Sequence, residues 1–217
     1  MQQVLRAATG DTLRIGILDG PQGVAHIDAL APDAVHCRCA FDAHTEPRPT
    51  DALVLAIPRP NIAERCLAHA AALGFGTIVL VRTQRVEKSH LDARVLQPES
   101  IRRHLISGLE QARRTHLPAV HVERRFRPFV EDRLDALLPP TNRVLAHPDA
   151  TQEVTALDLL RGAPLTLAIG PEGGFIPHET ELLTGRGFTA ARAGLHPLRV
   201  ETALAFVTGQ LFAQRIR

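Results

Sequence analysis

Residues 164–183 read PLTLAIGPEGGFIPHETELL, and their pattern indicates the fold class. The apolar run at 165–169 is typical of a buried strand, and the GPEGG segment after it places three glycines and a proline around one carboxylate, Glu172. Pro177 suits the first position of a helix, and Glu179 complements the dipole of that helix. The stretch therefore predicts a strand, a tight turn and a helix, which is the repeating unit of an α/β protein.

The same alternation continues along most of the chain. Short apolar runs with the sequences ALVLAI, TIVLV, AVHV and RVLAH are separated by amphipathic segments. We expect helices over Ile62–Leu73, Glu99–Thr115, Pro128–Leu137, Pro177–Gly185 and Val200–Arg215. Such alternation predicts a parallel sheet that is covered by helices on both faces.

The first 41 residues follow a different pattern. The segments TLRIGIL, GVAHIDAL and AVHCRCAF are separated by turn signals at 19–20 and 31–33, which predicts a small β-rich module. The polar segment DAHTEPRPTD at 42–51 is typical of a linker. The sequence thus predicts two domains, residues 1–45 and residues 51–217.

Composition narrows the possible partners. A net charge of +2 over 217 residues confines any nucleic-acid site to a local patch. Such a patch lies at 101–127, with seven Arg and two Glu, although an exposed helix face explains this cluster as well as a binding surface does. The three cysteines lack CxxC spacing, and no apolar run approaches the roughly 18 residues of a membrane span. We expect a cytoplasmic protein with no metal, disulfide or membrane segment.

Familiar catalytic motifs are missing. No serine lies in a Gly-x-Ser-x-Gly turn, the histidines form no HExxH pair, and Lys88, the only lysine, has no glycine-rich loop. In HCRC at 36–39 the two cysteines face one side of a strand and His36 the other, which favours packing over a metal site. The candidate site must therefore be sought among loops.

Three loops follow apolar runs. One is GPEGG, one begins at His147, and one covers 194–198 ahead of a helix that carries Arg199 and Glu201. A Gly/Pro turn by itself is most often only a turn, but ligands of open parallel sheets bind beyond the carboxyl ends of strands, where glycine lets the backbone approach closely. Three such loops predict a cleft at one edge of the sheet.

Between Leu165 and Leu211 the motifs IGPEGGF, PHETELL, GRGF and GL..LR.ETA occur in an order and spacing that resemble the RsmE family of the SPOUT superfamily. EQARRTHLP at 110–118 is similar to another segment of that family. Its members methylate N3 of a uridine in small-subunit ribosomal RNA. The resemblance implies a PUA-like β-rich RNA-binding domain, a SPOUT-type α/β domain with a C-terminal trefoil knot, S-adenosylmethionine as cofactor, and a homodimer.

The resemblance also implies site residues. Its cofactor loops carry over to Leu145, Ala146, His147, Ile169, Gly170, Pro171, Glu172, Gly173, Gly174, Gly194, Leu195, His196, Pro197 and Leu198. Arg199 would stabilise charge on the uracil, and Glu201 would orient Arg199 or accept a proton, while Glu172 would alternatively cap the helix that follows it. Candidates for holding the RNA backbone are Arg82, Arg85, Arg113 and Arg114.

The sequence departs from this family in places. His196-Pro197 stands where members commonly have Arg-Ile, and proline removes one backbone N–H from the loop. The β-rich module begins at MQQVLRAATGD, so we expect its first strand to be absent. The alternatives are a catalytically weak or inactive relative that acts as an RNA-binding, ribosome-associated module, and a phosphate- or nucleotide-binding α/β protein.

Overall fold

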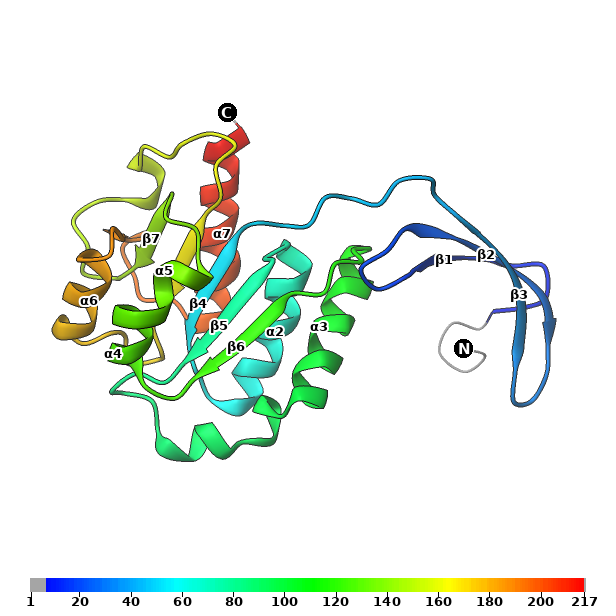
Figure 1. Ribbon diagram of the computed structural model, residues 1–217, viewed down its shortest axis with the longest axis horizontal. Coiled ribbons are helices and arrows are strands. Elements are labelled where there is room, and N and C mark those ends of the chain that lie inside the picture. The colour runs from blue at the N-terminus through cyan, green and yellow to red at the C-terminus, as the bar shows by residue number, and fades with distance from the viewer. Residues whose placement is uncertain (1–6, 217) are drawn as a thin grey trace.

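Figure 1 shows the computed structural model, which describes residues 7–216, as two sheets joined by an extended segment. The first sheet is antiparallel, in the order β1-β2-β3, with strands Thr12–Gly16, Gln22–Leu30 and Val35–Phe41. It confirms the predicted β-rich module. The prediction that the first strand of this module is absent concerns the start of the chain, which lies outside the described residues. Its buried side is small: in β2 only Ala25 and Ile27 are buried, at 3% and 2% exposed.

The segment at 42–51 has no regular structure, as the linker prediction requires. Asp19, in the β1–β2 turn, attaches the first sheet to the second: its N–H donates to the carbonyl of Thr115 at 2.8 Å. Its carboxylate accepts the N–H of Leu117 at 3.1 Å and pairs with Arg48 at 3.2 Å. His116 lies against the same carboxylate at 3.7 Å, so this turn holds the module to the α/β body.

The second sheet is the predicted parallel sheet, in the order β6-β5-β4-β8-β7-β9. Its strands are β4 Ala52–Ala56, β5 Thr77–Val81, β6 Ala119–Glu123, β7 Arg143–Ala146, β8 Thr166–Ile169 and β9 Thr189–Ala191. Every residue of β4 and β8 is buried, in keeping with their place at the centre of a sheet that is covered on both faces. Because all six strands are parallel, their carboxyl ends share one edge.

Helices cover both faces (Figure 1). One face carries α2 Pro60–Leu73, α3 Pro98–Ala112 and α7 Val200–Ile216, and the other carries α4 Phe126–Pro128, α5 Leu134–Leu137 and α6 Pro177–Thr184. Short 3₁₀ turns lie at Lys88–Asp92, Arg94–Leu96 and Val154–Ala156. Gly108 lets α3 pack closely on α2, because an added Cβ would lie 2.0 Å from the carbonyl oxygen of Ala68.

Two helix predictions need correction. The helix expected to reach Thr115 ends at Ala112, because Arg113 takes a left-handed conformation with φ 54° and ends the helix. The helix expected over 128–137 begins two residues earlier and winds as a π-helix over Phe129–Arg133 between α4 and α5. Arg133, at the end of that wide turn, bonds the buried carboxylate of Glu123, a contact between distant elements that local periodicity does not reveal.

Candidate functional site at the ends of three strands

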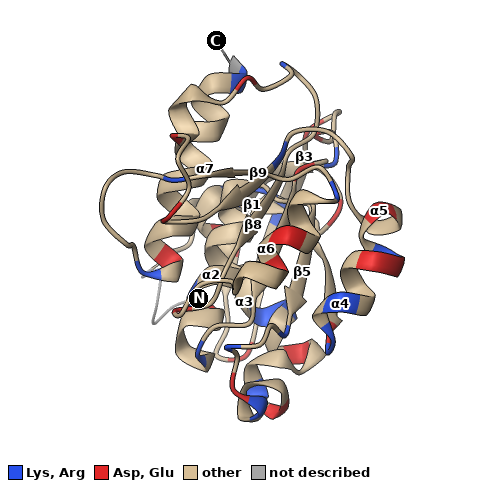
Figure 2. Cartoon of the chain, turned by 90° about the vertical axis from the view of Figure 1, so that its left-hand side faces the viewer, with Lys and Arg blue, Asp and Glu red and all other residues tan. Residues whose placement is uncertain are grey.

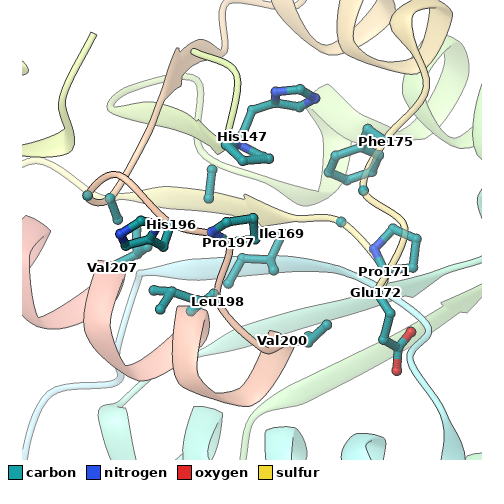
Figure 3. Close-up of a pocket in the computed structure, with 17 residues that line it drawn as sticks. His147, Ile169, Pro171, Glu172, Phe175, His196, Pro197, Leu198, Val200 and Val207 are labelled. Carbon is teal, nitrogen blue, oxygen red and sulfur yellow. The ribbon is translucent and has the colours of Figure 1, made fainter. Parts of the chain in front are cut away.

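A cleft opens where β7, β8 and β9 end, between the three loops that follow them (Figure 3). The space between the loops, open solvent at its mouth included, is about 700 Å³. Its lining is Ala146, His147, Pro148, Ile169, Gly170, Pro171, Glu172, Gly174, Phe175, Ala193, Gly194, His196, Pro197, Leu198, Val200, Ala203 and Val207. Most of these side chains are apolar, so the polar groups available to a ligand are chiefly those of the backbone.

The GPEGG loop forms one wall. The N–H of Gly174 donates to the carbonyl of Pro171 at 2.8 Å, which closes a tight turn, and Gly174 has φ 72°. An added Cβ on Gly170 would lie 3.0 Å from the backbone nitrogen of Phe175, so the loop folds back on its own start. An added Cβ on Gly174 would meet nothing within 4 Å, so the backbone here stands free of side-chain cover.

Glu172 does not cap the helix that follows it, which corrects one of the two roles suggested for it. Its carboxylate points away from the other labelled lining residues in Figure 3 and accepts the N–H of Arg59 at 3.2 Å, which ties the loop to the start of α2. The cap of α6 is Glu179, which is 4% exposed and accepts the N–H of Ile176 at 3.0 Å. The other oxygen of Glu179 accepts the N–H of Gln84 at 2.7 Å, so this carboxylate also fixes the loop after β5.

The loop after β9 forms the opposite wall and depends on a carboxylate outside the predicted set. Glu153 bonds the guanidinium of Arg192 at 2.7 Å and accepts the N–H of Gly194 at 3.4 Å. These bonds hold the pKa of Glu153 below its usual value, and the bond from Arg192 has the largest effect. Desolvation acts in the opposite direction and is outweighed. Gly194 has φ 88°, and an added Cβ there would meet nothing within 4 Å. Nothing in the spacing of the sequence singles out Glu153, because it meets Arg192 only through the fold.

The loop after β7 joins these two walls. The N–H of His147 donates to the carbonyl of Ala191 in β9 at 3.0 Å, and the His147 ring accepts the N–H of Asp149 at 3.2 Å. Figure 3 shows the rings of His147, His196 and Pro197 around the upper and left sides of the cleft. Pro197 lines the cleft without a backbone N–H to offer, so its neighbours supply the donors of this loop.

The two predicted catalytic residues lie at the start of α7. Arg199 is exposed and makes no ion pair among the residues that the structure describes. Glu201 has a side chain 14% exposed and pairs with Arg65 at 3.7 Å, and no contact within residues 7–216 supports its orienting Arg199. The thiol of Cys66 lies nearby: burial, and then the Glu201 and Glu172 carboxylates, raise its pKa to about 12.

Eleven of the fourteen predicted cofactor residues line the cleft. Leu145 is buried within β7, Leu195 is 81% exposed, and the carbonyl of Gly173 accepts a bond from Arg85 outside the lining. Sequence reasoning missed the lining residues Pro148, Phe175, Ala193, Val200, Ala203 and Val207. The last three lie one helical turn apart on α7, a spacing that can be read from the sequence. The sequence does not show which face of the helix meets the cleft, because packing decides that.

The four predicted RNA-binding arginines separate into two places. Arg82 and Arg85 follow β5, at the same edge as the cleft. Arg113 and Arg114 precede β6 and lie at the opposite edge, beside the attachment of the first sheet. The guanidinium of Arg114 packs over Gly74, where an added Cβ would lie 2.7 Å from Cζ.

The described part of the chain holds no cluster of three metal-ligating side chains. Among the helices that the structure describes, none combines the length and the apolar character needed to cross a membrane.

Comparisons with known proteins agree with this geometry. A family model described as "RNA methyltransferase domain" matches residues 46–211. The chain is 33% identical over 214 residues to ribosomal RNA small subunit methyltransferase E of Treponema pallidum. The aligned region covers 94% of this chain and 77% of that protein. The chain is 23% identical over 202 residues to ribosomal RNA small subunit methyltransferase E 1 of Borreliella burgdorferi, which covers 93% of this chain and 83% of the relative.

Solved structures share the fold. A Legionella pneumophila protein with bound S-adenosylmethionine superposes with a TM-score of 0.78 at 24% identity, over 98% of this chain and 87% of that one. Ribosomal RNA small subunit methyltransferase E of Neisseria gonorrhoeae, bound to S-adenosylmethionine, gives a TM-score of 0.77 at 21% identity over the same shares of the two chains. At these identities the likeness concerns the fold.

Proposed function

This chain belongs to the RNA methyltransferase family, and we propose that it transfers a methyl group from S-adenosylmethionine to small-subunit ribosomal RNA, at N3 of a uridine. The observation that carries the proposal is the glycine-rich cleft at the ends of β7, β8 and β9. The names of the relatives support the RNA substrate and methyl transfer, and they disfavour the alternative of an inactive RNA-binding module.

The cleft fits the cofactor. Ile169, Val200 and Val207 offer apolar contacts to an adenine face, and the backbone of Gly174 and Gly194 stands uncovered on opposite walls. A Cβ at either glycine would project into open space, so each leaves room where a ligand would need it. The cofactor, when bound, supplies an electrophilic methyl group on a sulfonium. The two walls would hold it, and the apolar lining would exclude water from around it.

The chemistry at the RNA needs a charge-stabilising group and a proton acceptor. N3 of uracil carries a proton, so its attack on a methyl group requires that this proton leave and that the developing negative charge be stabilised. We assign the second role to Arg199, which is exposed at the cleft and unpaired among the described residues. Glu201 is the candidate proton acceptor that the family resemblance implies, and in that role its carboxylate would have to leave Arg65, with which it pairs at 3.7 Å.

RNA binding follows from the same placement. Arg82 and Arg85 lie at the cleft edge, where they can hold phosphates beside the reacting base. Arg113 and Arg114 lie near the attachment of the first sheet, where RNA held by a PUA-like module would pass. Acting on ribosomal RNA would place the protein in the cytoplasm with the ribosome.

A homodimer would cover an apolar surface beside the cleft. Phe206 on the outer face of α7 is 47% exposed, and Leu195 and Leu198 in the neighbouring loop are 81% and 40% exposed. A contiguous patch of such side chains would mark a protein interface. We assign this surface to a second copy of the chain, and we expect the cofactor loops to form the C-terminal trefoil knot that the resemblance implies.

Methyl transfer tests the proposal directly. Purified chain, S-adenosylmethionine and unmodified small-subunit ribosomal RNA are incubated, and the digested nucleosides are analysed by mass spectrometry. We expect 3-methyluridine from the parent chain and a loss of at least tenfold in rate for Arg199→Ala with cofactor binding retained. A different methylated nucleoside would overturn the uridine assignment, and no methylation would overturn the activity.

A further inference from the structure

Five arginines follow the strands that lie beside the cleft. They are Arg59 after β4, Arg82 and Arg85 after β5, and Arg124 and Arg125 after β6. The sheet order is β6-β5-β4-β8, and every strand is parallel, so these residues share the edge at which the cleft opens. We call these five residues the carboxyl-edge arginines.

None of the carboxyl-edge arginines forms an ion pair with a carboxylate of the described residues. Two arginines that follow in the same segment behave differently, since Arg127 pairs with Glu131 at 2.7 Å and Arg133 pairs with Glu123. Figure 2 shows Lys and Arg segments by α4 and the lower end of β5, while Asp and Glu mark α5 and α6. The edge thus carries positive charge that the protein leaves unneutralised.

Three carboxylates close to this edge are engaged by other groups. Glu123 is buried against Arg133, and Glu179 accepts two backbone N–H groups. Glu172 accepts the N–H of Arg59, which leaves the guanidinium of that residue free. Glu87, which is exposed after β5, accepts a bond from the Ser89 hydroxyl at 3.5 Å and lies 3.9 Å from the His90 ring.

The carboxyl-edge arginines reach the wall of the cleft itself. Arg85 donates from its guanidinium to the carbonyl of Gly173 in the GPEGG loop. Glu179 holds the neighbouring Gln84 N–H, so the loop that carries Arg82 and Arg85 is fixed against that wall. From β6 to β8 are three strand spacings of about 4.8 Å, so the carboxyl-edge arginines extend roughly 14 Å from the cleft.

We propose that the carboxyl-edge arginines form the track for the phosphate backbone of the RNA on one side of the target nucleotide. The inference rests on the proposed function. Guanidinium groups bind phosphate with two parallel hydrogen bonds, and unpaired arginines do so without first breaking an ion pair. The strand would run across the ends of β4, β5 and β6 while the target base enters the cleft at β8.

The test uses salt-dependent binding of deproteinised small-subunit ribosomal RNA. Each phosphate contact contributes about −0.7 to the slope of log affinity against log salt for single strands. The double variant Arg124→Ala/Arg125→Ala should therefore have a slope shallower by about 1.4, with a raised KM for RNA and an unchanged kcat. Arg59→Gln, on another strand end, should make the slope shallower by about 0.7.

The matched control is Arg102→Ala/Arg103→Ala, which removes the same charge from the exposed face of α3. We expect it to keep the parental slope. Equal slopes for the parent, the Arg124/Arg125 double variant and Arg59→Gln, with unchanged melting temperatures, would overturn the track. An equal loss in the control would also overturn it, because charge alone would then explain the effect. Methyl transfer by the parent on the same RNA separates these outcomes from a failure of the proposed function.

Discussion

Removing the carboxylate of Glu179 should destabilise the protein more than any nearby surface change. In Glu179→Ala the N–H groups of Ile176 and Gln84, bonded at 3.0 and 2.7 Å, lose their acceptor in a place where the side chain is 4% exposed. Hydrogen bonds to a charged group contribute about 1.5–3 kcal/mol each, so we expect a loss of at least about 3 kcal/mol. With an unfolding entropy near 2.1 cal/mol/K per residue, that corresponds to a melting temperature lower by roughly 7 °C.

The assay is thermal unfolding followed by circular dichroism, with Glu181→Ala as the control on the same helix. Glu181 is exposed and its carboxylate lies 4.0 Å from the His178 ring, so its removal should change the stability by less than about 0.5 kcal/mol. Glu179→Gln keeps one acceptor oxygen and should fall between the two. A melting temperature of Glu179→Ala equal to that of the Glu181→Ala control would refute the double role of the Glu179 carboxylate.

Three other measurements examine separate parts of the account. Gly108→Ala should lower the stability by about 2 kcal/mol or more, because its Cβ would lie 2.0 Å from the Ala68 carbonyl. Gly209→Ala, whose Cβ would meet nothing within 4 Å, should raise the stability by up to about 1 kcal/mol. Melting curves of the two variants and the parent measure both changes. The lowered pKa of Glu153 adds stability that is present above the usual pKa of 4.5 and is lost as the pH falls through the folded-state pKa. In denaturant titrations, the difference in the free energy of unfolding between the parent and Glu153→Gln should therefore shrink below that pH. Phe206→Asp should convert a dimer to a monomer in light scattering, and a parent that is monomeric at micromolar concentration would contradict the α7 interface.

Local patterns in the sequence predicted the elements well, because strands and helices leave periodic marks. Pro177 does begin α6, and the apolar run at 165–169 contains the buried strand β8. The order of the strands left no such mark, since the position of β8 between β4 and β7 depends on long crossovers. The glycine loops predicted where the cleft lies, because only their backbone freedom was required.

The rest of the site depends on contacts between distant residues. Glu153 meets Arg192 and Glu179 meets Gln84 only after the sheet has formed, so neither pair has a sequence signal. The same reason separates Arg113 from Arg82: both lie beside strands, but at opposite ends of them. Which edge a residue occupies follows from strand direction, which the cluster of arginines at 101–127 did not disclose.

We expect the cleft between the loops of β7, β8 and β9 to bind S-adenosylmethionine. Calorimetric titration of this compound into the parent and into Gly194→Val tests it, because valine at φ 88° would strain the loop that lines the cleft. We expect one site per chain in the parent and at least tenfold weaker binding in the variant. Absence of binding to the parent, or equal affinity in both proteins, would contradict the account.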